Sequence, residues 1–468
     1  MSTVTNLIED ILEIKSSTGY LLLPFPILQI SNLKFTIGLF ADKHKSKLPT
    51  IKWETGYSLG LRQVMDGTNF IKCRNLKLKD MKVRIIIYSF LLFLSDTTVF
   101  AQTSNPLKTW ADSIDVYGRE VFMPADQYKW DWGQATMLNS MIHLYHAKPA
   151  SQKQIYLDYV KTAMDKTYND ANGAHPNAVA SGHGMAFLAR ITGDPKYIEK
   201  ADKIYLDYLT TPRTKAGGVS HRTETVEMWD DTIYMLSMYL LEMYRYTGDD
   251  RYLKEFYDQF LIHKQKLADK KWGLWVHGYD DDNDDYKDRC CQLGWAQMTP
   301  QRTSIEFWGR GNGWVVMALA DALKTVPAKS TYFKAFAKEL KEITRKLPEL
   351  QDAKTGLWFQ LLIYPEDPKN FIESSCTAMF AYGMAIGVEL KVLNKKTFLP
   401  VVEKAYAGLR KNATKHEGKN IIPTRVCEGT CIGDREYYFG RKTKEGVNYA
   451  IGAYIMLEIE YEKLNHKN

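Results

Sequence analysis

Apolar residues recur every three or four positions along segment after segment of the chain from residue 102 onward. This spacing is the period of an α-helix that buries one face, so it predicts a succession of helices. The segments that fit it are residues 106–117, 131–147, 151–167, 178–192, 195–209, 229–247, 250–265, 312–325, 331–347, 373–390, 396–412 and 446–464. The pattern therefore predicts an all-α fold of twelve helices.

Two classes of segment alternate along this series. The even-numbered segments are apolar nearly all round and rich in Gly, Ala and Ser, as expected of helices buried on all sides. The odd-numbered segments alternate Lys and Glu with apolar residues, like helices of an outer layer. The alternation predicts an (α/α)6 barrel of six inner and six outer helices, forming one domain over residues 102–468. A superhelical solenoid is the alternative, because periodicity does not show that the ring closes.

A repeated turn supports stacked helical hairpins. Residues 187–209 and 243–261 share the pattern Thr-Gly-Asp-x-x-Tyr, with Thr192 and Thr247 55 residues apart. Gly ends one helix in the left-handed conformation, Asp caps the next helix, and Tyr packs between the two.

Residues 81–101 read MKVRIIIYSFLLFLSDTTVFA, a Met followed by two positive charges, a short apolar run and a small-residue cleavage site. This is the pattern of a secretory signal peptide, whose apolar part is too short to span a bilayer of about 30 Å. We therefore expect Met81 to be the true start and residues 1–80 to be an over-extended start or a disordered leader. The mature protein is then exported, to the periplasm, without stable membrane insertion. A cytoplasmic extension with a membrane anchor is the alternative.

The charge balance argues against a nucleic-acid partner. The chain has a formal net charge of +7, but residues 1–101 hold 13 Lys and Arg against 8 Asp and Glu, which is +5. The remainder therefore carries 7 − 5 = +2, and it contains no Lys/Arg cluster interleaved with aromatic residues.

Unusual residues gather at the N-terminal ends of the expected inner helices. The motifs are WDWG (130–133), AHPNAVASG (174–182), EMWDD (227–231), FWGRGNGW (307–314), FIESS (371–375) and VNYAIG (447–452). In an up-down barrel these ends open on one face, where the helix dipoles present their positive ends. Such a face suits an anionic, ring-shaped ligand, although helix capping alone is the favoured explanation of WDWG.

Two motifs, FWGRGNGW (307–314) and GLWVHGYD (273–280), offer side chains for binding. In FWGRGNGW, Arg310 has room to project between glycines, and Trp308 and Trp314 are placed to bracket a sugar. An arginine fork binds a carboxylate with two hydrogen bonds, although Arg310 could instead pair with Glu306 or Asp231. In GLWVHGYD, His277 lies in a short extended segment, where a lone histidine is more often a structural hydrogen-bonding residue.

The stretch EMWDDTIYML places Asp230 and Asp231 side by side. On a helix, Asp230 shares a polar stripe with Tyr234 and Ser237, whereas Asp231 shares an apolar one with Met235 and Met238. Apolar surroundings raise the pKa of a carboxyl, so the pattern leans weakly towards Asp231 as a general acid. Asp230 is expected to serve as a cap charge or a loop partner.

Neither a metal nor a cofactor is expected. No Cys/His spacing resembles a zinc site, and DDDNDDYKD (280–288) lacks the glycine and the final acidic residue of a calcium loop. Cysteines include the pair Cys290-Cys291 and the pair Cys427 and Cys431, which an exported protein could join in a disulfide.

Four ordered motifs carry a resemblance to a known family: W-x-D-x-x-x-M, G-L-x-x-H-x-x-D, W-x-R-G-N-G-W and E-S-S-x-x-A-M-F. Over residues 106–464 the chain resembles the unsaturated glucuronyl and galacturonyl hydrolases of glycoside hydrolase family 105, with family 88 as the near neighbour. The resemblance implies an (α/α)6 barrel that acts on lyase-generated oligosaccharides. Such enzymes remove a 4,5-unsaturated uronic acid from the non-reducing end by hydrating its vinyl ether double bond, and they need no metal.

The resemblance also implies residue roles. The general acid/base is the aspartate of W-x-D, here Asp231. The residues expected to hold the uronate are Trp229, Trp308, Arg310 and Trp314, with His277 as a polar neighbour at the substrate site. One position departs from the family, since the second aspartate expected on the fourth helix is replaced by Asn177. Asn177 can bind substrate or water but cannot be a base.

Other functions remain open at this point. An inverting glycosidase acting on a saturated, uronic-acid-containing glycan would need a second carboxylate about 6.5–9.5 Å from the first, and Asp131, Glu227 and Glu373 are candidates. A non-catalytic glycan-binding barrel would keep the tryptophans and tolerate loss of Asp231. The parent polysaccharide, the neighbouring sugar and the oligomeric state do not follow from the sequence.

Overall fold

The computed structural model describes residues 110–466, apart from 285, 286 and 288, together with three strands nearer the N-terminus. The chain divides into two compact units, residues 1–104 and 105–468.

The first unit is described only for its strands. They are β1 (Gln29–Ile30), β2 (Leu33–Phe40) and β3 (Thr50–Thr55). The strands form an antiparallel sheet in the order β1-β2-β3. The expected signal peptide and its Met81 lie outside the described residues.

The second unit is built from helices, and each of the twelve expected segments corresponds to one of them. The long helices are α3 (Trp110–Val116), α4 (Trp132–Ala147), α5 (Ala150–Lys166), α6 (Pro176–Thr192), α7 (Pro195–Tyr208), α8 (Thr232–Thr247), α9 (Asp250–Leu267), α10 (Gly309–Thr325), α11 (Thr331–Thr344), α13 (Ser374–Glu389), α14 (Lys395–Asn412) and α16 (Asn448–His466). The shorter ones are a π-helix at Tyr117–Phe122, 3-10 turns at Ala125–Gln127 and Trp295–Met298, α12 (Leu347–Leu350) and α15 (Arg435–Phe439).

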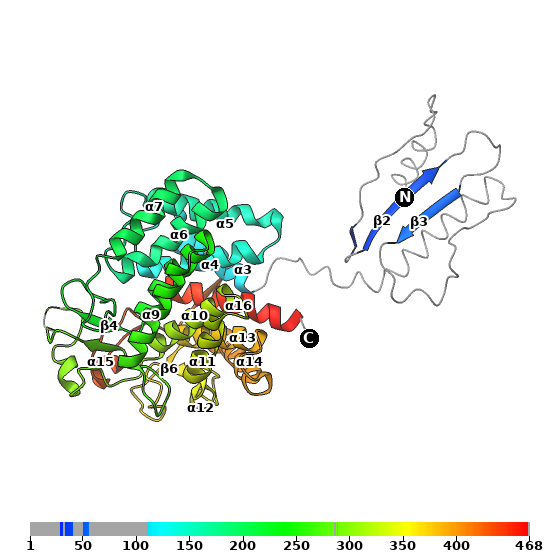
Figure 1. The fold of residues 1–468 in the computed structure, drawn as a ribbon. Coiled ribbons are helices and arrows are strands. Elements are labelled where there is room, and N and C mark those ends of the chain that lie inside the picture. Colours follow the sequence, from blue (N-terminus) through cyan, green and yellow to red (C-terminus); the bar gives the residue numbers. More distant parts are fainter. Residues whose placement is uncertain are drawn as a thin grey trace. The chain divides into compact units, whose positions relative to one another are not determined.

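The inner helices close into a ring. Around the ring, the neighbours that pack against each other are α4 and α6, α6 and α8, α8 and α10, α10 and α13, α13 and α16, and α16 and α4. The outer helices α5, α7, α9, α11 and α14 each pack on the inner helix that precedes them, and α3 packs on α16. Figure 1 shows the helices of this unit packed together, most of them labelled. The (α/α)6 barrel is confirmed and the open solenoid is excluded.

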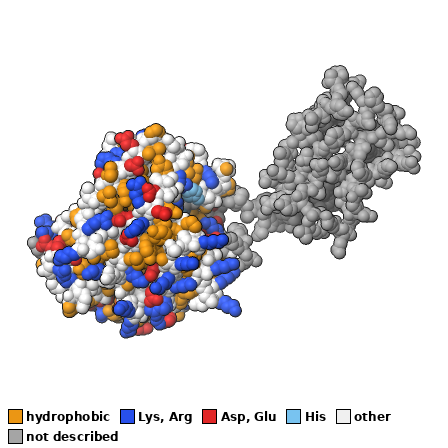
Figure 2. Space-filling view, in the orientation of Figure 1, with side chains coloured by type: hydrophobic (Ala, Val, Ile, Leu, Met, Phe, Trp, Pro, Cys, Tyr) orange, Lys and Arg blue, Asp and Glu red, His pale blue; other side chains and the backbone are white. Residues whose placement is uncertain are grey.

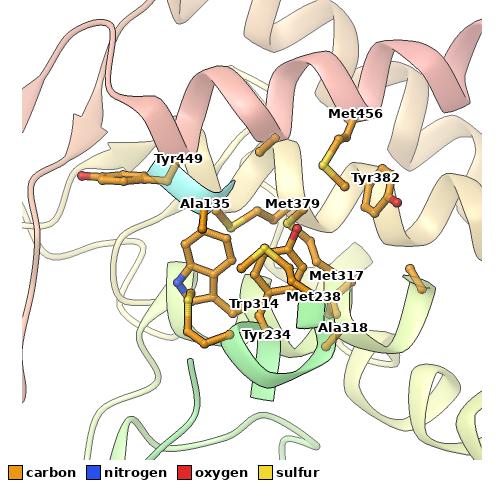
Figure 3. Close-up of a cluster of buried hydrophobic side chains, with 14 of the residues drawn as sticks. Ala135, Tyr234, Met238, Trp314, Met317, Ala318, Met379, Tyr382, Tyr449 and Met456 are labelled. Carbon is orange, nitrogen blue, oxygen red and sulfur yellow. The ribbon is translucent and has the colours of Figure 1, made fainter. Parts of the chain in front are cut away.

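Burial follows the two classes of segment seen in the sequence. On inner helix α13, residues 374–388 are all buried. The outer helices bury one stripe, as on α11, where Phe336 and Leu340 are buried and Lys334, Lys338 and Lys341 face solvent. Methionines and aromatic rings from several inner helices fill the centre of the barrel (Figure 3).

The repeated Thr-Gly-Asp turns are confirmed in detail. Gly193 and Gly248 adopt the left-handed conformation, with φ of 67° and 68°. Asp194 accepts a hydrogen bond from the amide of Lys196, and Asp249 caps α9 in the same way. Only glycine adopts this backbone conformation without a steric cost, which is why it ends both inner helices.

Short antiparallel ribbons join the helices and correct two expected boundaries. The pairs are β4 (Glu227–Trp229) with β5 (Gly278–Asp280), β6 (Trp358–Phe359) with β7 (Ile372–Glu373), β8 (Thr414–Glu417) with β9 (Asn420–Pro423), and β10 (Val426–Cys427) with β11 (Thr443–Lys444). The helices expected from residues 229 and 373 begin at Thr232 and Ser374 instead, because the residues before them pair with a neighbouring segment.

The surface of the barrel carries both signs of charge. On the face shown in Figure 2, Lys and Arg side chains lie among Asp and Glu, with apolar area between them. Within the part of the chain that the structure describes, no helix has the length and hydropathy needed to cross a membrane.

Candidate active site

A continuous series of contacts joins the N-terminal ends of the inner helices α4, α6, α8, α10 and α16. In order, the contacting pairs are Asn177 with His221, His221 with Trp229, Trp229 with His277, His277 with Trp308, Trp308 with Arg310, Arg310 with Tyr449, Tyr449 with Trp132, and Trp132 with Trp314. The series includes all the predicted substrate-binding residues, and it meets Asp231 at His277. The sequence motifs therefore do gather at one mouth of the barrel.

The two aspartates lie at the junction of β4 and α8. The Asp230 amide donates to the carbonyl of His277 at 2.9 Å, which continues the β4–β5 pairing by one residue. This contact turns the Asp230 side chain into the protein, where it is completely buried. Asp231 occupies the N-cap position of α8, and 15% of its side chain is exposed. Only Asp231 therefore reaches the mouth.

The protonation pattern of this pair corrects a prediction. Burial, followed by the charge of Asp231, raises the pKa of Asp230 well above its usual range. Burial acts in the same direction on Asp231, but the neighbouring His277 and His221 outweigh it and lower its pKa to about 2. The expectation that Asp231 itself has the raised pKa is wrong, because histidines and not methionines face its carboxyl. Asp230 is also not a cap, since neither oxygen has a hydrogen-bond partner among the described residues.

His277 lies between the catalytic candidate and the barrel wall. Its Nδ1 is 2.8 Å from the hydroxyl of Tyr438, and its ring stacks on Trp308 with centroids 4.3 Å apart. Its Nε2 faces Asp231 Oδ1 at 3.7 Å, which is longer than a direct hydrogen bond. Burial lowers the pKa of His277, so the ring is neutral near pH 7. The structure thus places a polar neighbour of Asp231 at the position that the resemblance implied.

His221 is a site residue that the sequence analysis missed. Its ring stacks on Trp229 at 4.4 Å, and burial lowers its pKa to about 3. In the neutral ring, Nδ1–H donates to the hydroxyl of Thr232 at 2.9 Å, and Nε2 accepts from the Asn177 amide at 3.3 Å. Asn177 therefore orients a histidine in place of carrying a carboxylate. His221 belongs to the loop before β4 and to no recognisable motif, so only the folded structure reveals it.

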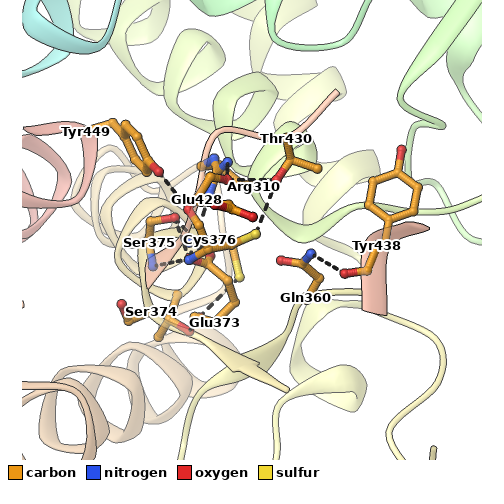
Figure 4. A network of polar contacts seen from close by, with 12 residues as sticks. Arg310, Gln360, Glu373, Ser374, Ser375, Cys376, Glu428, Thr430, Tyr438 and Tyr449 are labelled. Carbon is orange, nitrogen blue, oxygen red and sulfur yellow. Dashed lines mark hydrogen bonds and ion pairs between the residues drawn. The ribbon is translucent and has the colours of Figure 1, made fainter. Parts of the chain in front are cut away.

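Arg310 does not offer the open fork that the sequence predicts. Its side chain is buried, and its two terminal nitrogens donate to the carbonyls of Cys427 and Glu428 at 2.7 and 2.8 Å (Figure 4). The guanidinium also lies between the rings of Trp308 and Tyr449, each 4.6 Å away. These contacts hold the loop after β10 against the barrel, and the prediction that Arg310 binds the uronate stays a prediction. The alternatives of pairing with Glu306 or Asp231 are also not seen among its described contacts.

Arg310→Lys should consequently destabilise the protein. A lysine ammonium cannot reach both carbonyls in the same geometry, so at least one hydrogen bond to a charged group is lost. We expect a decrease of about 1.5–3 kcal/mol in the free energy of unfolding, measured by urea denaturation. Arg222→Lys, a matched change at the half-buried arginine of the mouth, should leave stability within about 0.5 kcal/mol. If Arg310→Lys and the unmodified protein are equally stable, the structural role of Arg310 is refuted and binding of the substrate remains its role.

The three predicted tryptophans form the wall of the site and do not project into it. Trp229, Trp308 and Trp314 are 3%, 1% and 1% exposed. Trp314 stacks on Tyr234 inside the barrel with centroids 4.9 Å apart, as Figure 3 shows. Trp314 thus packs within the barrel, and the expectation that Trp308 and Trp314 bracket a sugar stays a prediction. The half-buried Trp132 of WDWG is the more accessible indole of this group.

Arg222 supplies positive charge at the mouth. Its guanidinium lies 4.5 Å from the ring of Trp229 and is half-buried. Its charge also contributes to the lowered pKa of both His221 and His277, which places it close to Asp231's two neighbours. An arginine in this position can bind an anionic substrate group beside Asp231.

The three alternative carboxylates all have structural partners. Glu373 accepts hydrogen bonds from the amides of Ser375, Cys376 and Cys427 and so caps α13 (Figure 4). Glu227 accepts from the indole nitrogen of Trp229 at 2.9 Å. Asp131 caps α4, as expected for WDWG. These contacts weaken the inverting-glycosidase alternative, because the candidate second carboxylates are already engaged.

Cysteines link two loops beside this wall. Cys290 forms a disulfide with Cys431, while Cys427 is buried and outside it, so the expected Cys427–Cys431 pairing is wrong. The two linked loops carry Trp295 and Ile432, which pack on Trp229. Cys427 instead lies buried in β10.

Ligand-type atoms of Asp230, Asp231 and His277 lie within 4.8 Å of one another, a grouping that sequence spacing did not reveal. Arg222 and Arg310 add positive charge beside His277, one member of this group.

Comparisons with known proteins agree with this geometry. A profile of Glycosyl Hydrolase Family 88 matches residues 108–465. Unsaturated rhamnogalacturonyl hydrolase YesR of Bacillus subtilis is 26% identical over 316 residues, spanning 65% of this chain and 81% of that protein. A glycoside hydrolase from family 105 of C. acetobutylicum has a TM-score of 0.66 at 22% identity, with 76% of this chain and 100% of that chain covered. A possible member of the same family from Klebsiella pneumoniae has a TM-score of 0.61 at 25% identity, with 72% and 84% covered.

The family profile covers most of the chain, and the barrel, the four motifs and the mouth with its aspartate pair are all in place. The resemblance to family 105 and its near neighbour is confirmed, and the chain belongs to Glycosyl Hydrolase Family 88, a family of glycoside hydrolases.

Proposed function

We propose that the protein is an exo-acting hydrolase that removes a 4,5-unsaturated uronic acid from the non-reducing end of lyase-generated oligosaccharides. The reaction adds water across the vinyl ether double bond of the uronate. The resulting hemiketal opens, and the next sugar is released. A relative named as an unsaturated rhamnogalacturonyl hydrolase supports this substrate class.

The placement of Asp231 carries the proposal. It is a partly exposed carboxyl at the N-terminal end of an inner helix, with His277 3.7 Å away and His221 close enough to alter its pKa. As the acid it gives a proton to C4 of the unsaturated ring, and positive charge develops at C5 and the ring oxygen. As the resulting carboxylate it takes a proton from the water that attacks C5. The cycle returns Asp231 to its protonated form, so one group serves as acid and base.

The surrounding residues divide the binding task. Arg222 is placed to hold the uronate carboxylate, while Trp229 and His277 wall the sugar ring on the side of Asp231. Asn177 fixes the tautomer of His221, which keeps the neutral ring oriented at the mouth. The half-buried Trp132 offers an aromatic surface for the adjoining sugar.

A panel of oligosaccharides tests the proposal. Disaccharides produced by polysaccharide lyases should lose the ultraviolet absorbance of their double bond when the protein is added, and their saturated counterparts should not react. Hydrolysis of the saturated counterparts alone would show an inverting glycosidase. Binding without turnover of either set would show a glycan-binding barrel.

We also propose that the protein is exported, since residues 81–101 have the pattern of a signal peptide. The Cys290–Cys431 disulfide supports this, because disulfides persist in oxidising compartments. N-terminal sequencing of the native protein should find a start near Gln102, and a start before Met81 would refute the proposal.

A further inference from the structure

We propose that Asp230 and Asp231 act as one carboxyl pair that shares a single proton, with Asp230 storing the proton that Asp231 delivers to the substrate. This inference rests on the proposed hydration reaction and assigns a positioning role to a residue next to the acid. It answers a difficulty of the site: Asp231 is ionised in the free protein, whereas the first step needs it protonated.

The geometry leaves Asp231 and His277 as the proton acceptors grouped with Asp230. Its side chain is completely buried, and both carboxyl oxygens lack a hydrogen-bond partner among the described residues. An ionised carboxylate in that position would have no well-formed hydrogen bond, at a cost of several kcal/mol. A protonated Asp230 avoids the cost, and its nearest carboxyl is Asp231, within 4.8 Å.

Gly311 shows that the Asp230 carboxyl is fitted closely to its place. A Cβ built on Gly311 would come within 2.2 and 2.5 Å of the two Asp230 oxygens. The backbone of the first turn of α10 therefore lies directly against the Asp230 carboxyl. The space beside the Asp230 carboxyl has no room for a side chain at position 311.

The groups around Asp230 and Asp231 favour the state in which the two carboxyls together hold one proton. On the neighbouring elements, Asp230 faces Asp231 from α8, His277 from the segment after α9 and Tyr438 from α15. Arg310 from α10 and Arg222 from the loop before β4 add positive charge at His277. Two ionised carboxylates at this separation repel each other, so the second proton dissociates only at higher pH. The raised pKa of Asp230 and the lowered pKa of Asp231 agree with this distribution.

The proton transfer balances without any co-reactant. When the anionic uronate binds beside Asp231 and displaces solvent, the ionised form of Asp231 is disfavoured. The O–H bond of Asp230 breaks as an O–H bond forms on Asp231, and the negative charge moves to Asp230. After Asp231 has protonated C4 and taken a proton from water, the proton returns to Asp230 when the product leaves.

Asp230→Asn tests this role by its pH profile. The amide fills the same space but cannot hold a transferable proton, so Asp231 alone must bind the proton, with a low pKa. We expect kcat at neutral pH to fall at least tenfold and the basic limb of the kcat/KM profile to move down by at least one pH unit. Activity should recover partly as the pH is lowered. A residue that only shapes the site would reduce activity by the same factor at every pH, and that result would overturn the proposal.

A second measurement does not depend on turnover. A buried carboxyl with a raised pKa stabilises the folded protein below the ordinary Asp pKa of about 3.9, and this contribution is lost as the pH rises through the folded-state pKa. The free energy of unfolding should therefore fall more steeply with pH, above pH ~4, in the unmodified protein than in Asp230→Asn. Parallel curves would show that Asp230 holds no proton in the folded state, whatever the activity.

Further measurements distinguish the shared proton from a failure of the proposed function and from a metal site. If the unmodified protein does not act on unsaturated disaccharides, the proposed function fails, while the unfolding curves still decide whether Asp230 stores a proton. If EDTA abolishes activity and a divalent cation restores it, the three grouped side chains bind a metal, and the shared proton is refuted. Asp131→Asn, which makes the same change at the cap of α4, should keep the pH profile of the unmodified protein.

Discussion

Asp231→Asn should abolish turnover of unsaturated disaccharides, with kcat reduced by about 10³-fold or more. The amide can neither protonate C4 nor take a proton from water, and both tasks fall on this one group. The change removes little volume from a side chain that is already partly exposed, so the free energy of unfolding should change by only about 1 kcal/mol. Steady-state kinetics and urea denaturation measure the two effects.

Substrate binding provides the control for this variant. The dissociation constant of the unsaturated disaccharide for Asp231→Asn, measured by calorimetry, should stay within about threefold of that inferred for the active protein. An active Asp231→Asn protein would show that another group protonates the substrate. Because Asp230 remains in this variant, such a result would point directly to the buried member of the pair.

Gly311→Ala should cause the second largest loss. The new methyl group would meet the two Asp230 oxygens at 2.2 and 2.5 Å and its Cγ at 2.6 Å, all well inside van der Waals contact. Either Asp230 leaves its position or α10 shifts away from α8, and overpacking of this kind typically costs about 1–3 kcal/mol. We expect a lower free energy of unfolding together with a loss of at least tenfold in kcat, because both outcomes displace the carboxyl pair.

Gly429→Ala is the matched control, since a Cβ at that position meets nothing within 4 Å. It should retain the kinetics and the stability of the unmodified protein. Normal kinetics for Gly311→Ala would mean that Asp230 can move without consequence, which contradicts the close fit on which its role depends.

The architecture was predictable because it depends on periodicity. Inner helices such as α13 are apolar all round, and outer helices such as α11 have one apolar stripe, so the two layers are visible in the sequence. Ring closure was not visible, since the packing of α16 on α4 joins segments from opposite ends of the domain.

The motifs predicted where the mouth of the barrel lies, but not the orientation and contacts of the side chains in it. A helical stripe suggested apolar surroundings for Asp231, yet the residues before α8 are extended, and the pairing of β4 with β5 turns Asp230 inward. Arg310 looked accessible between two glycines, but its carbonyl partners lie more than 100 residues away in the chain. His221 and Arg222 belong to no sequence motif. They contact Trp229 only because the loop before β4 folds back onto it.

Turnover in heavy water tests the hydration reaction most directly. Protonation of C4 is the step that commits the substrate, so the uronate released in deuterium oxide should carry one deuterium at C4 that comes from the solvent through Asp231. Nuclear magnetic resonance of the product measures this incorporation, with the same product exchanged in the absence of protein as the blank. The account predicts one deuterium at C4 and, once the hemiketal has opened, a ketone at C5 whose oxygen comes from water. Release of the neighbouring sugar without deuterium at C4 would show that the bond is broken at the anomeric carbon, and would contradict it.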